Sequence, residues 1–375
     1  MRKLASVQKI KQICSIDGAD RIEIAKVLGW QVVVGKNEFK PGDLVVYFEI
    51  DSFLPVREEF EFLRNRSYKK SELLGEGFRL RTMTMRGELS QGLIMPLDAV
   101  KYYGAEEPIA LSVITVCDGE STPRKLKEGD DVSVILGVKE WQIPEMATSG
   151  GTIIGQASTF ISVTDETRVQ SLEGLFEEFK GKPYYITTKL DGSSHSVCID
   201  HHGNFHVFGH NYEYKDDGKS MFYEYVKKHE VELLIRKYMT LNDLTSMIVQ
   251  GEWCGAGIQK NRLQLKQPKW FFFTVDENER RAGLEEMKRF WQFCVDEGRP
   301  LDIVPVVETG EDLLSKYKTV DELLERAGED TSRIYNGGEP EGIVIRPKEP
   351  VFSKLLRGPL SMKVINNRYL LKNKE

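Results

Sequence analysis

Apolar and polar residues alternate along much of the first 140 positions, a pattern typical of half-buried β-strands. Two such runs, residues 25–35 and 39–50, are joined through turn-forming residues and predict a pair of neighbouring strands. Further strands are predicted at 78–87 and 127–138. Short strands at close spacing, with Gly, Pro and Asp between them, favour a small closed β-barrel for this part of the chain.

The second half of the chain combines helices with strands. Apolar residues recur at helical spacing in three segments, which predicts amphipathic helices at 169–179, 225–238 and 284–295. A fourth helix is predicted after Thr319, because Thr319 and Glu322 have the spacing of a capping box. Between these helices the apolar pattern predicts strands at 184–189, 194–200, 204–208, 247–253, 270–275 and 342–346. Hairpins without regular strand–helix alternation indicate an α+β domain of antiparallel sheets with flanking helices.

The length of 375 residues is too great for one typical core, so two domains are expected. Residues 144–160 are rich in Gly, Ser and Thr and nearly uncharged, which is typical of a linker. We therefore expect one domain at 1–143 and a second at 163–375, connected by a linker at 144–162.

Composition places the chain among soluble globular proteins, with 40% hydrophobic and 29% charged residues. The five cysteines are scattered without CxxC spacing, which fits a reducing compartment and argues against a disulfide framework. No apolar run approaches the length of a membrane span, and the charged N-terminus differs from a signal peptide. We expect a cytoplasmic protein without a membrane partner, and a monomer by default.

Charge is unevenly distributed, although the formal net charge of −6 gives no overall basic field. Residues 64–86 hold seven basic side chains against two acidic ones. Strand alternation in this segment places Arg79 and Arg81 on one face, with Arg86 at the end of the run. A solvated surface is the simplest interpretation of such a run, and a nucleic-acid contact requires further support.

Four short segments of the second half share one arrangement, a polar residue beside a hydrophobic strand. They are T-T-K-L-D-G (187–192), I-V-Q-G-E-W (248–253), E-G-I-V-I-R (341–346) and S-M-K-V-I-N (361–366), with W-F-F-F-T-V (270–275) between the second and third. Taken singly each segment is a weak signal, since K-x-D-G also occurs in many surface turns. Together they contain the groups that one reaction requires.

That reaction is nucleophilic attack on a phosphate by a lysine. The amine of Lys189 reacts only when neutral, and its ordinary pKa near 10.4 keeps it charged. Burial at a strand end and a neighbouring cation, either Lys363 or a metal ion, would favour the neutral form. A triphosphate also needs a divalent cation, for which Glu341 is a suitable oxygen ligand.

The remaining members of the set suit the nucleoside. Glu252 can accept hydrogen bonds from ribose hydroxyls, and Phe273 can stack on a base. Gly192 and Gly342 allow the backbone to approach a ligand closely.

The order of these motifs resembles that of the covalent nucleotidyltransferase superfamily, which includes polynucleotide ligases and messenger-RNA capping enzymes. Residues 39–55 and 78–93 also resemble the N-terminal OB-type domain of one clade of ATP-dependent RNA ligases. The resemblance implies an OB-type β-barrel followed by an ATP-grasp-like nucleotidyltransferase domain. It covers almost the whole chain.

The resemblance further implies the reaction. An ATP-dependent RNA ligase joins 3′-OH and 5′-phosphate ends through a lysyl-AMP and an AMP-capped RNA intermediate. The expected cofactors are ATP and a divalent metal, Mg²⁺ or Mn²⁺. The expected partner is RNA, as nicked duplexes, free ends or RNA/DNA hybrids, and the clade favours nicks in duplexes.

Individual roles follow from the resemblance. Lys189 would carry AMP, Lys363 would contact the α-phosphate, and both would be catalytic. Glu341 would bind the metal. The other nucleotide-binding residues would be Asp191, Gly192, Glu252, Phe273 and Arg346. Phe272 remains an alternative to Phe273, because the aromatic run leaves the register open.

Two positions depart from the family pattern. Ser361 stands where a basic residue often precedes the final lysine, so another phosphate contact is needed, for which Arg357 and Arg368 are candidates. His210, followed by Asn211, stands where an arginine contacts nucleic acid. The implied nucleic-acid-binding residues are therefore His210, Asn211, Arg79, Arg81 and Arg86.

Three alternatives stay open. A DNA ligase or a capping guanylyltransferase is disfavoured by the N-terminal domain and by the short stretch after Lys363. A non-catalytic nucleic-acid-binding protein is disfavoured by the intact motifs. Five of six histidines fall within 195–210, but a structural metal site is disfavoured because no carboxylate or cysteine has the spacing to complete a ligand set.

Overall fold

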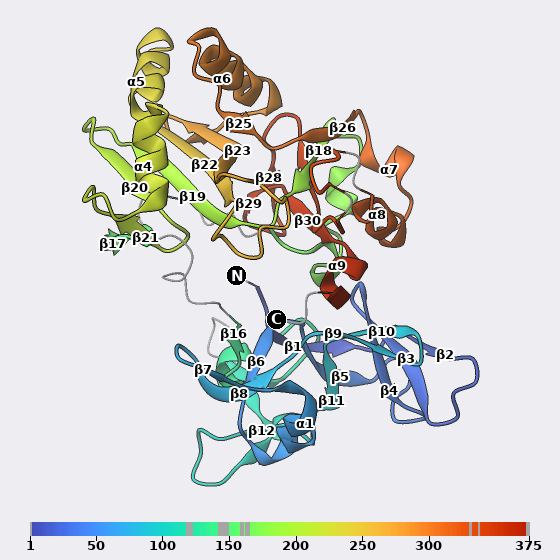
Figure 1. Cartoon of the computed structure of the whole chain (residues 1–375). Helices are drawn as coiled ribbons and strands as arrows, with labels where there is room; N and C mark the ends of the chain where they lie inside the picture. Colours follow the sequence, from blue (N-terminus) through green and yellow to red (C-terminus); the bar gives the residue numbers. More distant parts are fainter. Residues whose placement is uncertain are drawn as a thin grey trace. The chain divides into compact units, whose positions relative to one another are not determined.

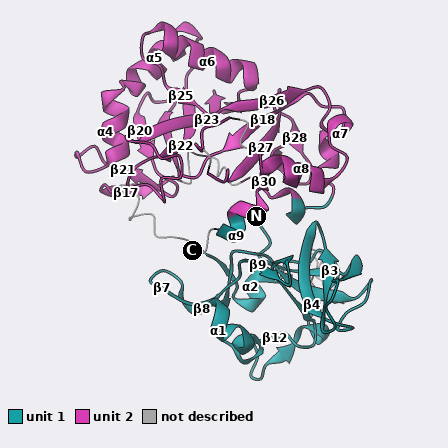
Figure 2. Ribbon diagram, turned by 45° about the vertical axis from the view of Figure 1, so that its right-hand side comes forward, with its two compact units in different colours: residues 1–143, 170–173, 370–375 teal, residues 144–169, 174–369 magenta. Residues whose placement is uncertain are grey.

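The computed structural model describes residues 2–117, 123–141, 150–157, 161, 166–329, 332–336 and 338–372 (Figure 1). The chain divides into two compact units (Figure 2). Unit 1 consists of residues 1–143, 170–173 and 370–375, and unit 2 of residues 144–169 and 174–369. Among the described residues, no helix is long and apolar enough to cross a membrane.

Unit 1 is built from short antiparallel strands in several small sheets. Its larger sheets are, in strand order, β1 (Ala5–Lys9), β5 (Leu44–Phe48) and β11 (Leu93–Pro96); β2 (Gln12–Ser15), β3 (Ile22–Val27) and β4 (Trp30–Gly35); and β16 (Lys139–Glu140), β6 (Ser52–Pro55), β8 (Gly75–Arg79) and β7 (Tyr68–Ser71). Three strand pairs are β9 (Thr82–Met85) with β10 (Glu88–Gln91), β12 (Lys101–Tyr102) with β13 (Ile109–Ala110), and β14 (Thr115–Cys117) with β15 (Pro123–Lys125). Its helical segments are η1 (Glu58–Leu63), α1 (Arg64–Ser67), η2 (Leu111–Val113) and α2 (Ser133–Leu136).

Strand β5 lies at the centre of unit 1. Its alternate residues enter two hydrophobic clusters, with Val46 and Phe48 in one and Val45 and Tyr47 in the other. This is the period-two pattern of a strand that is buried on both faces. The separate sheets of the described residues do not join into one closed ladder, which differs from the closed barrel expected from the sequence.

Three predictions for unit 1 are wrong in detail. Residues 25–35 form the hairpin β3–β4, which turns at Leu28 with a φ of 53°, and β5 pairs with β1 and β11 instead. Residues 78–87 divide between β8 and β9, which belong to different sheets. Within 127–138, the helix α2 forms because Asp131 accepts hydrogen bonds from Ser133 and Gly137 ends the turn with a φ of 67°.

Unit 2 contains two large sheets. The eight-stranded sheet follows the order β17 (Ile153–Gln156), β21 (Tyr212–Tyr214), β20 (Phe205–Phe208), β19 (Ser193–Ile199), β22 (Met247–Cys254), β23 (Lys269–Glu277) and β24 (Arg280–Arg281), with β25 (Asp302–Ile303) beside β23. The four-stranded sheet follows the order β26 (Val306–Gly310), β18 (Tyr184–Lys189), β27 (Gly342–Pro347) and β30 (Met362–Ile365). A further pair is β28 (Phe352–Ser353) with β29 (Gly358–Pro359).

The strand predictions for the second half are confirmed, with ends that differ by at most two residues. Strand β17 lies inside the stretch expected to be a linker, where it pairs with β21. Residues 144–149, 158–160 and 162 of that stretch lie outside the described residues.

The helices of unit 2 agree less well with those predicted from the sequence. Helix α6 (Leu284–Asp296) confirms one prediction, whereas 225–238 is divided into α4 (Met221–Lys228) and α5 (Val231–Leu241) at Glu230, whose φ is 51°. Residues 169–179 form only two 3₁₀ turns, η4 (Val169–Ser171) and η5 (Glu177–Phe179), with Gly174 at a φ of 83° between them. The other helices of the described residues are α7 (Leu313–Lys316), α8 (Val320–Ala327) and α9 (Asn367–Lys372), which belongs to unit 1 from Leu370 onward.

The predicted helix start at Thr319 is present, but the capping box is only half formed. The Thr319 hydroxyl accepts a hydrogen bond from the Glu322 amide at 3.2 Å. The Glu322 carboxylate accepts from the amide of Lys318, at 2.7 Å, and not from that of Thr319.

The main core of unit 2 lies on one face of the eight-stranded sheet, where α4, α5 and α6 cover it (Figure 1). Phe272 of β23 belongs to this core. Phe271 belongs to a second cluster with Leu190 and Tyr335, against which Phe273 also packs. Strand alternation therefore separates Phe272 from its two aromatic neighbours.

Candidate active site

Strands β18, β27 and β30 align the predicted catalytic residues across one sheet. Lys189 lies opposite Gly342, and Lys363 lies opposite Val344 in the antiparallel ladders. Directly opposed residues point to the same face of a sheet, as do residues two apart along one strand. Lys189, Val344 and Lys363 therefore share one face, and Lys363 is buried there with 9% of its surface exposed.

Lys189 forms an ion pair at the end of β18. Its Nζ lies 2.8 Å from Oε1 of Glu341, and both side chains are largely buried. Glu341 immediately precedes Gly342, whose φ is +154°, and a Cβ there would lie 2.2 Å from the Val364 carbonyl oxygen. Glycine is therefore required at position 342, and the backbone there places the Glu341 carboxylate beside Lys189.

The electrostatic balance at Lys189 differs from the expectation. Burial lowers the pKa of Lys189, but the negative charges of Glu341 and Glu252 raise it by more than burial lowers it. The net shift of the pKa is therefore upward. Burial in turn raises the pKa of Glu341, against the opposing effect of Lys189. The pair therefore holds Lys189 as an ammonium, and burial alone does not neutralise it.

Glu252 on β22 approaches the same motif. Its Oε1 accepts a hydrogen bond from the Gly192 amide at 3.1 Å. A Cβ on Gly192 would lie 2.4 Å from the Trp253 carbonyl oxygen, so glycine is required for this approach. Burial raises the pKa of Glu252 to about 8, while Lys189 opposes the shift. Strongly shifted carboxyl groups that gather around one lysine are typical of functional sites.

Asp191 has partners that the sequence did not indicate. Its Oδ2 lies 2.5 Å from Nε of Arg262, and the guanidinium of Arg262 lies 5.0 Å from the centre of the Tyr369 ring. Burial, together with the charges of Glu341 and Asp191, raises the pKa of Tyr369. No local pattern marks either residue, because Arg262 lies in a loop and Tyr369 in a short C-terminal helix.

Arg168 is a further residue that sequence reasoning missed. It forms a parallel β-bridge with Lys363, whose amide donates to the Thr167 carbonyl at 3.0 Å. Arg168 is 9% exposed. Of the two proposed substitutes, Arg357 is exposed, and Nε of Arg368 lies 3.1 Å from a carboxylate oxygen of Glu339.

The aromatic run on β23 resolves into two faces. Phe272 is fully buried and packs edge-on against Phe290, with ring centres 5.7 Å apart. Phe273 is half-buried, its carbonyl accepts a hydrogen bond from Arg346 at 2.7 Å, and the Arg346 guanidinium lies 5.5 Å from the centre of its ring. Arg346 also pairs with Glu166. This geometry favours Phe273 over Phe272 for contact with a base.

Phe273 and Arg346 line a small hollow. Its other lining residues are Tyr185, Thr274, Arg281, Ala282, Met287, Pro347, Pro350, Pro359, Leu360 and Ser361. Tyr185 lies opposite Arg346 and four residues before Lys189 on β18, so the hollow adjoins the face that carries the lysine.

The candidate nucleic-acid contacts of unit 2 are exposed. His210 and Asn211 lie in the turn between β20 and β21. The neighbouring His206 meets two carboxylates, Glu213 at 2.7 Å and Asp200 at 3.4 Å. Within the described part of the chain, no group of three or more His, Cys, Asp or Glu residues is arranged to hold a metal ion.

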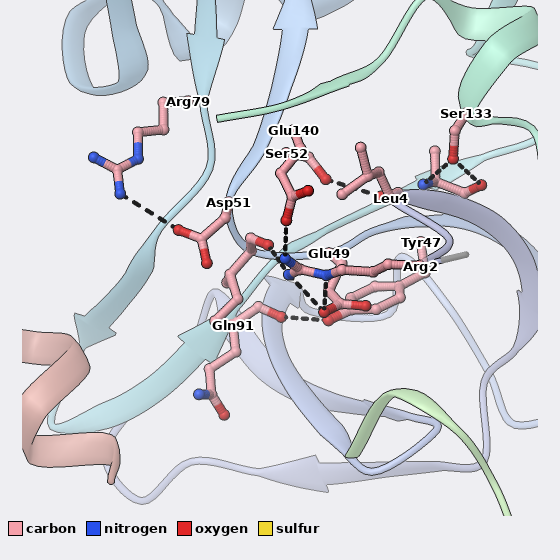
Figure 3. Close-up of polar contacts among 12 residues, drawn as sticks. Arg2, Leu4, Tyr47, Glu49, Asp51, Ser52, Arg79, Gln91, Ser133 and Glu140 are labelled. Carbon is pink, nitrogen blue, oxygen red and sulfur yellow. Dashed lines mark hydrogen bonds and ion pairs between the residues drawn. The ribbon is translucent and has the colours of Figure 1, made fainter. Parts of the chain in front are cut away.

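The three arginines of unit 1 differ in accessibility. Arg79 is 11% exposed, with Nη2 3.4 Å from Oδ1 of Asp51 (Figure 3). Its guanidinium lies 4.9 Å from the Trp141 ring centre. Arg81 is half-buried. Arg86 is exposed in the turn between β9 and β10, with a φ of 52°. Arg86 is therefore the most accessible of the three.

Comparisons with known proteins agree with this geometry. Residues 182–365 match the model of the RNA ligase family, and residues 4–97 match the model of an OB-fold domain. No curated protein matches the chain.

Solved structures of an RNA ligase from Naegleria gruberi are similar over the whole chain. The structure with PPi is 30% identical, covers 100% of this chain and 99% of that chain, and has a TM-score of 0.82. A mutant with AMP and Mn gives the same identity, coverage and score. Another mutant with ATP and Mn is 30% identical over 98% of this chain and 97% of that chain, with a TM-score of 0.80. The present chain thus belongs to the RNA ligase family, as an ATP-dependent RNA ligase with an N-terminal OB-fold domain.

Proposed function

We propose that this RNA ligase joins 3′-OH and 5′-phosphate ends at nicks in duplexes, with Lys189 as the nucleophile toward ATP. The observation that carries the proposal is the ion pair of Lys189 with Glu341, 2.8 Å long, at the end of a buried strand and on the face that holds Lys363. A lysine so placed can attack a phosphate that Lys363 contacts from the same side.

The reaction has three steps. Nζ of Lys189 loses its proton and attacks the α-phosphorus of ATP, so that a P–N bond forms and pyrophosphate leaves. A 5′-phosphate oxygen of RNA then attacks the same phosphorus, which frees Lys189 and gives AMP-capped RNA. Finally a 3′-OH attacks the RNA phosphorus, a phosphodiester forms and AMP leaves.

Glu341 fits the role of a metal ligand. Its Oε2 is buried and, among the described residues, has no hydrogen-bond partner. Such an atom suits a hard cation, either Mg²⁺ or Mn²⁺. When bound, the cation would offset the charges of Glu341 and the triphosphate and so favour the neutral amine of Lys189.

The remaining residues would bind the nucleotide. Phe273 would stack on adenine, with Arg346 holding the strand at its carbonyl, and Glu252 would contact the ribose. Asp191 and Gly192 would shape the turn that follows the nucleophile.

The phosphate contact that Ser361 lacks is proposed for Arg168. The β-bridge places Arg168 beside Lys363 on the neighbouring chain segment. On the RNA side, His210 and Asn211 of unit 2 and the arginines of unit 1 would contact the phosphate backbone.

The test uses α-labelled ATP and α-labelled GTP with Mg²⁺ or Mn²⁺, and compares the wild type with Lys189→Ala. We expect a labelled protein with ATP alone and no label on the variant. Parallel reactions then identify the preferred substrate by comparing nicked RNA duplex, nicked DNA duplex and single-stranded RNA. Absence of label with either nucleotide and either metal would contradict the proposal, and sealing of DNA alone would contradict its RNA specificity.

A further inference from the structure

Tyr335 contacts the main chain of the proposed nucleophile, Lys189, and has no role in the three-step reaction. Its side chain is fully buried. It packs in the cluster that contains Leu190 and Phe271, against which Phe273 also lies. The ring is therefore fixed against both the strand that carries the lysine and the strand that carries the base-stacking candidate.

The Tyr335 hydroxyl contacts the main chain of the proposed nucleophile. It donates a hydrogen bond to the Lys189 carbonyl oxygen at 2.6 Å. The Glu341 amide lies near enough to this hydroxyl to lower its pKa. One oxygen atom thus lies close to both backbone positions whose side chains meet at 2.8 Å. Burial raises the pKa of Tyr335, so the group stays a protonated donor.

This connection lies where the regular sheet ends. Lys189 is the last residue of β18, and its partner Gly342 is the first residue of β27. Glu341 precedes β27 and is held through its carbonyl, which accepts from Asn366 at 2.9 Å. Strand ends are less restrained than strand centres, so an additional hydrogen bond to the last residue of β18 limits the movement of Lys189.

We propose that Tyr335 is a positioning residue for lysine adenylation, because its hydroxyl holds the backbone of Lys189 at the strand end beside Glu341. The inference rests on the proposed role of Lys189. Tyr335 touches no reacting atom and acts through Lys189. A displacement of about 1 Å at a nucleophile can slow a reaction by about 100-fold, so loss of this one hydrogen bond has a measurable effect on rate.

Tyr47 in unit 1 offers a matched control. Its ring is also buried, and its hydroxyl donates to the main-chain carbonyl of Gln91 at 2.9 Å (Figure 3). Tyr335→Phe and Tyr47→Phe each remove one buried hydroxyl and keep the ring. The two variants therefore have a similar expected loss of stability, and only one of them loses a contact to the nucleophile.

The experiment measures single-turnover labelling of the full chain by α-labelled ATP over a range of ATP concentrations. Assays run about 20 °C below the lower melting midpoint of the variants, which are each expected to shift by a few degrees. We expect Tyr335→Phe to lower the maximal labelling rate about 10- to 100-fold, with a half-saturating ATP concentration within about 2-fold of the wild type. Tyr47→Phe should match the wild type in both quantities.

The outcomes separate the two levels of the proposal. No label on the wild-type protein would overturn the role of Lys189 itself. A labelled wild type with equal rates in both variants would overturn the role of Tyr335 alone. A Tyr335→Phe protein that changes only the half-saturating ATP concentration would also overturn it.

Discussion

Two buried ion pairs, one in each unit, differ in how completely their polar atoms are satisfied. In unit 1, Arg2 contacts Glu49 at 2.7 Å, Glu140 at 2.8 Å and the Ile50 carbonyl at 2.6 Å (Figure 3). In unit 2, Lys189 meets Glu341, whose second oxygen has no hydrogen-bond partner within the described residues. An ion pair whose polar atoms have partners stabilises the fold, whereas a carboxylate oxygen without a partner can still bind a ligand.

The carboxylates around Arg2 and Lys189 are equal in number but differ in their electrostatic balance. Glu49, Asp51 and Glu140 lie near Arg2, and Glu341, Glu252 and Asp191 lie near Lys189. Burial raises the pKa of Glu341 and of Glu252, so these two carboxylates are costly to hold in the charged form without a further positive charge. The site at Lys189 therefore favours binding of a cation.

The largest expected contrast comes from removing each cation. Lys189→Ala should abolish labelling by α-labelled ATP, because the nucleophile is lost. Arg2→Ala should lower the free energy of unfolding by about 3 kcal/mol, because it leaves Glu49 buried and unpaired, and should retain labelling while folded. Denaturant unfolding and labelling of both variants check this, and loss of labelling by folded Arg2→Ala would contradict the comparison.

The next largest effect is expected from Glu341→Gln. The substitution keeps the shape of the side chain but removes the charge that would hold a divalent cation, so the labelling rate should fall about 100- to 1000-fold. Titration of Mg²⁺ or Mn²⁺ in the labelling assay provides the measurement. A variant with the rate and metal requirement of the wild type would show that Glu341 does not bind the metal.

The sequence predicted the strands of unit 2 well because their apolar runs are bounded by polar motifs. The K-x-D-G and E-G-x-V-I-R segments each lie at a strand end, and register alone then brings Lys189 opposite Gly342. Helix 225–238 was predicted as one element because its apolar spacing continues across Glu230, where a backbone φ of 51° interrupts it. Periodicity contains no information on such a break.

Residues that reach the site from distant loops were beyond prediction. Arg168, Arg262 and Tyr335 lie outside any regular pattern, and only the tertiary fold brings them to Lys363, Asp191 and Lys189. The barrel prediction for unit 1 failed in a related way. Alternation identifies a strand but not its partner, so β5 was assigned to β4 although it pairs with β1 and β11.

A smaller effect is expected in the pH dependence of stability. Burial raises the pKa of Glu252 to about 8, whereas an unfolded Glu titrates near 4.3. The folded state therefore binds this proton more tightly, and the resulting stabilisation is complete below about pH 4 and is lost as the pH rises through 8. The stability advantage of the wild type over Glu252→Gln should accordingly decline between pH 5 and pH 8, on the order of 1–3 kcal/mol.

Denaturant unfolding of both proteins at several pH values measures this difference. Parallel stability curves across the range would show that Glu252 titrates normally. That result would remove one member from the crowded carboxylate group and weaken the contrast with the Arg2 pair.

The smallest expected effect concerns the exposed charge of unit 1. Arg86→Gln should weaken joining of nicked RNA a few-fold and lower the salt dependence of RNA binding by about one unit of slope, because one phosphate contact is lost. Labelling by ATP should be unchanged. Arg79→Gln provides the contrast, because Asp51 and Trp141 already engage its side chain and its loss should reduce stability more than RNA affinity. If Arg79→Gln reduced the salt slope and Arg86→Gln did not, RNA would contact the buried arginine, and accessibility would not identify the RNA-binding surface.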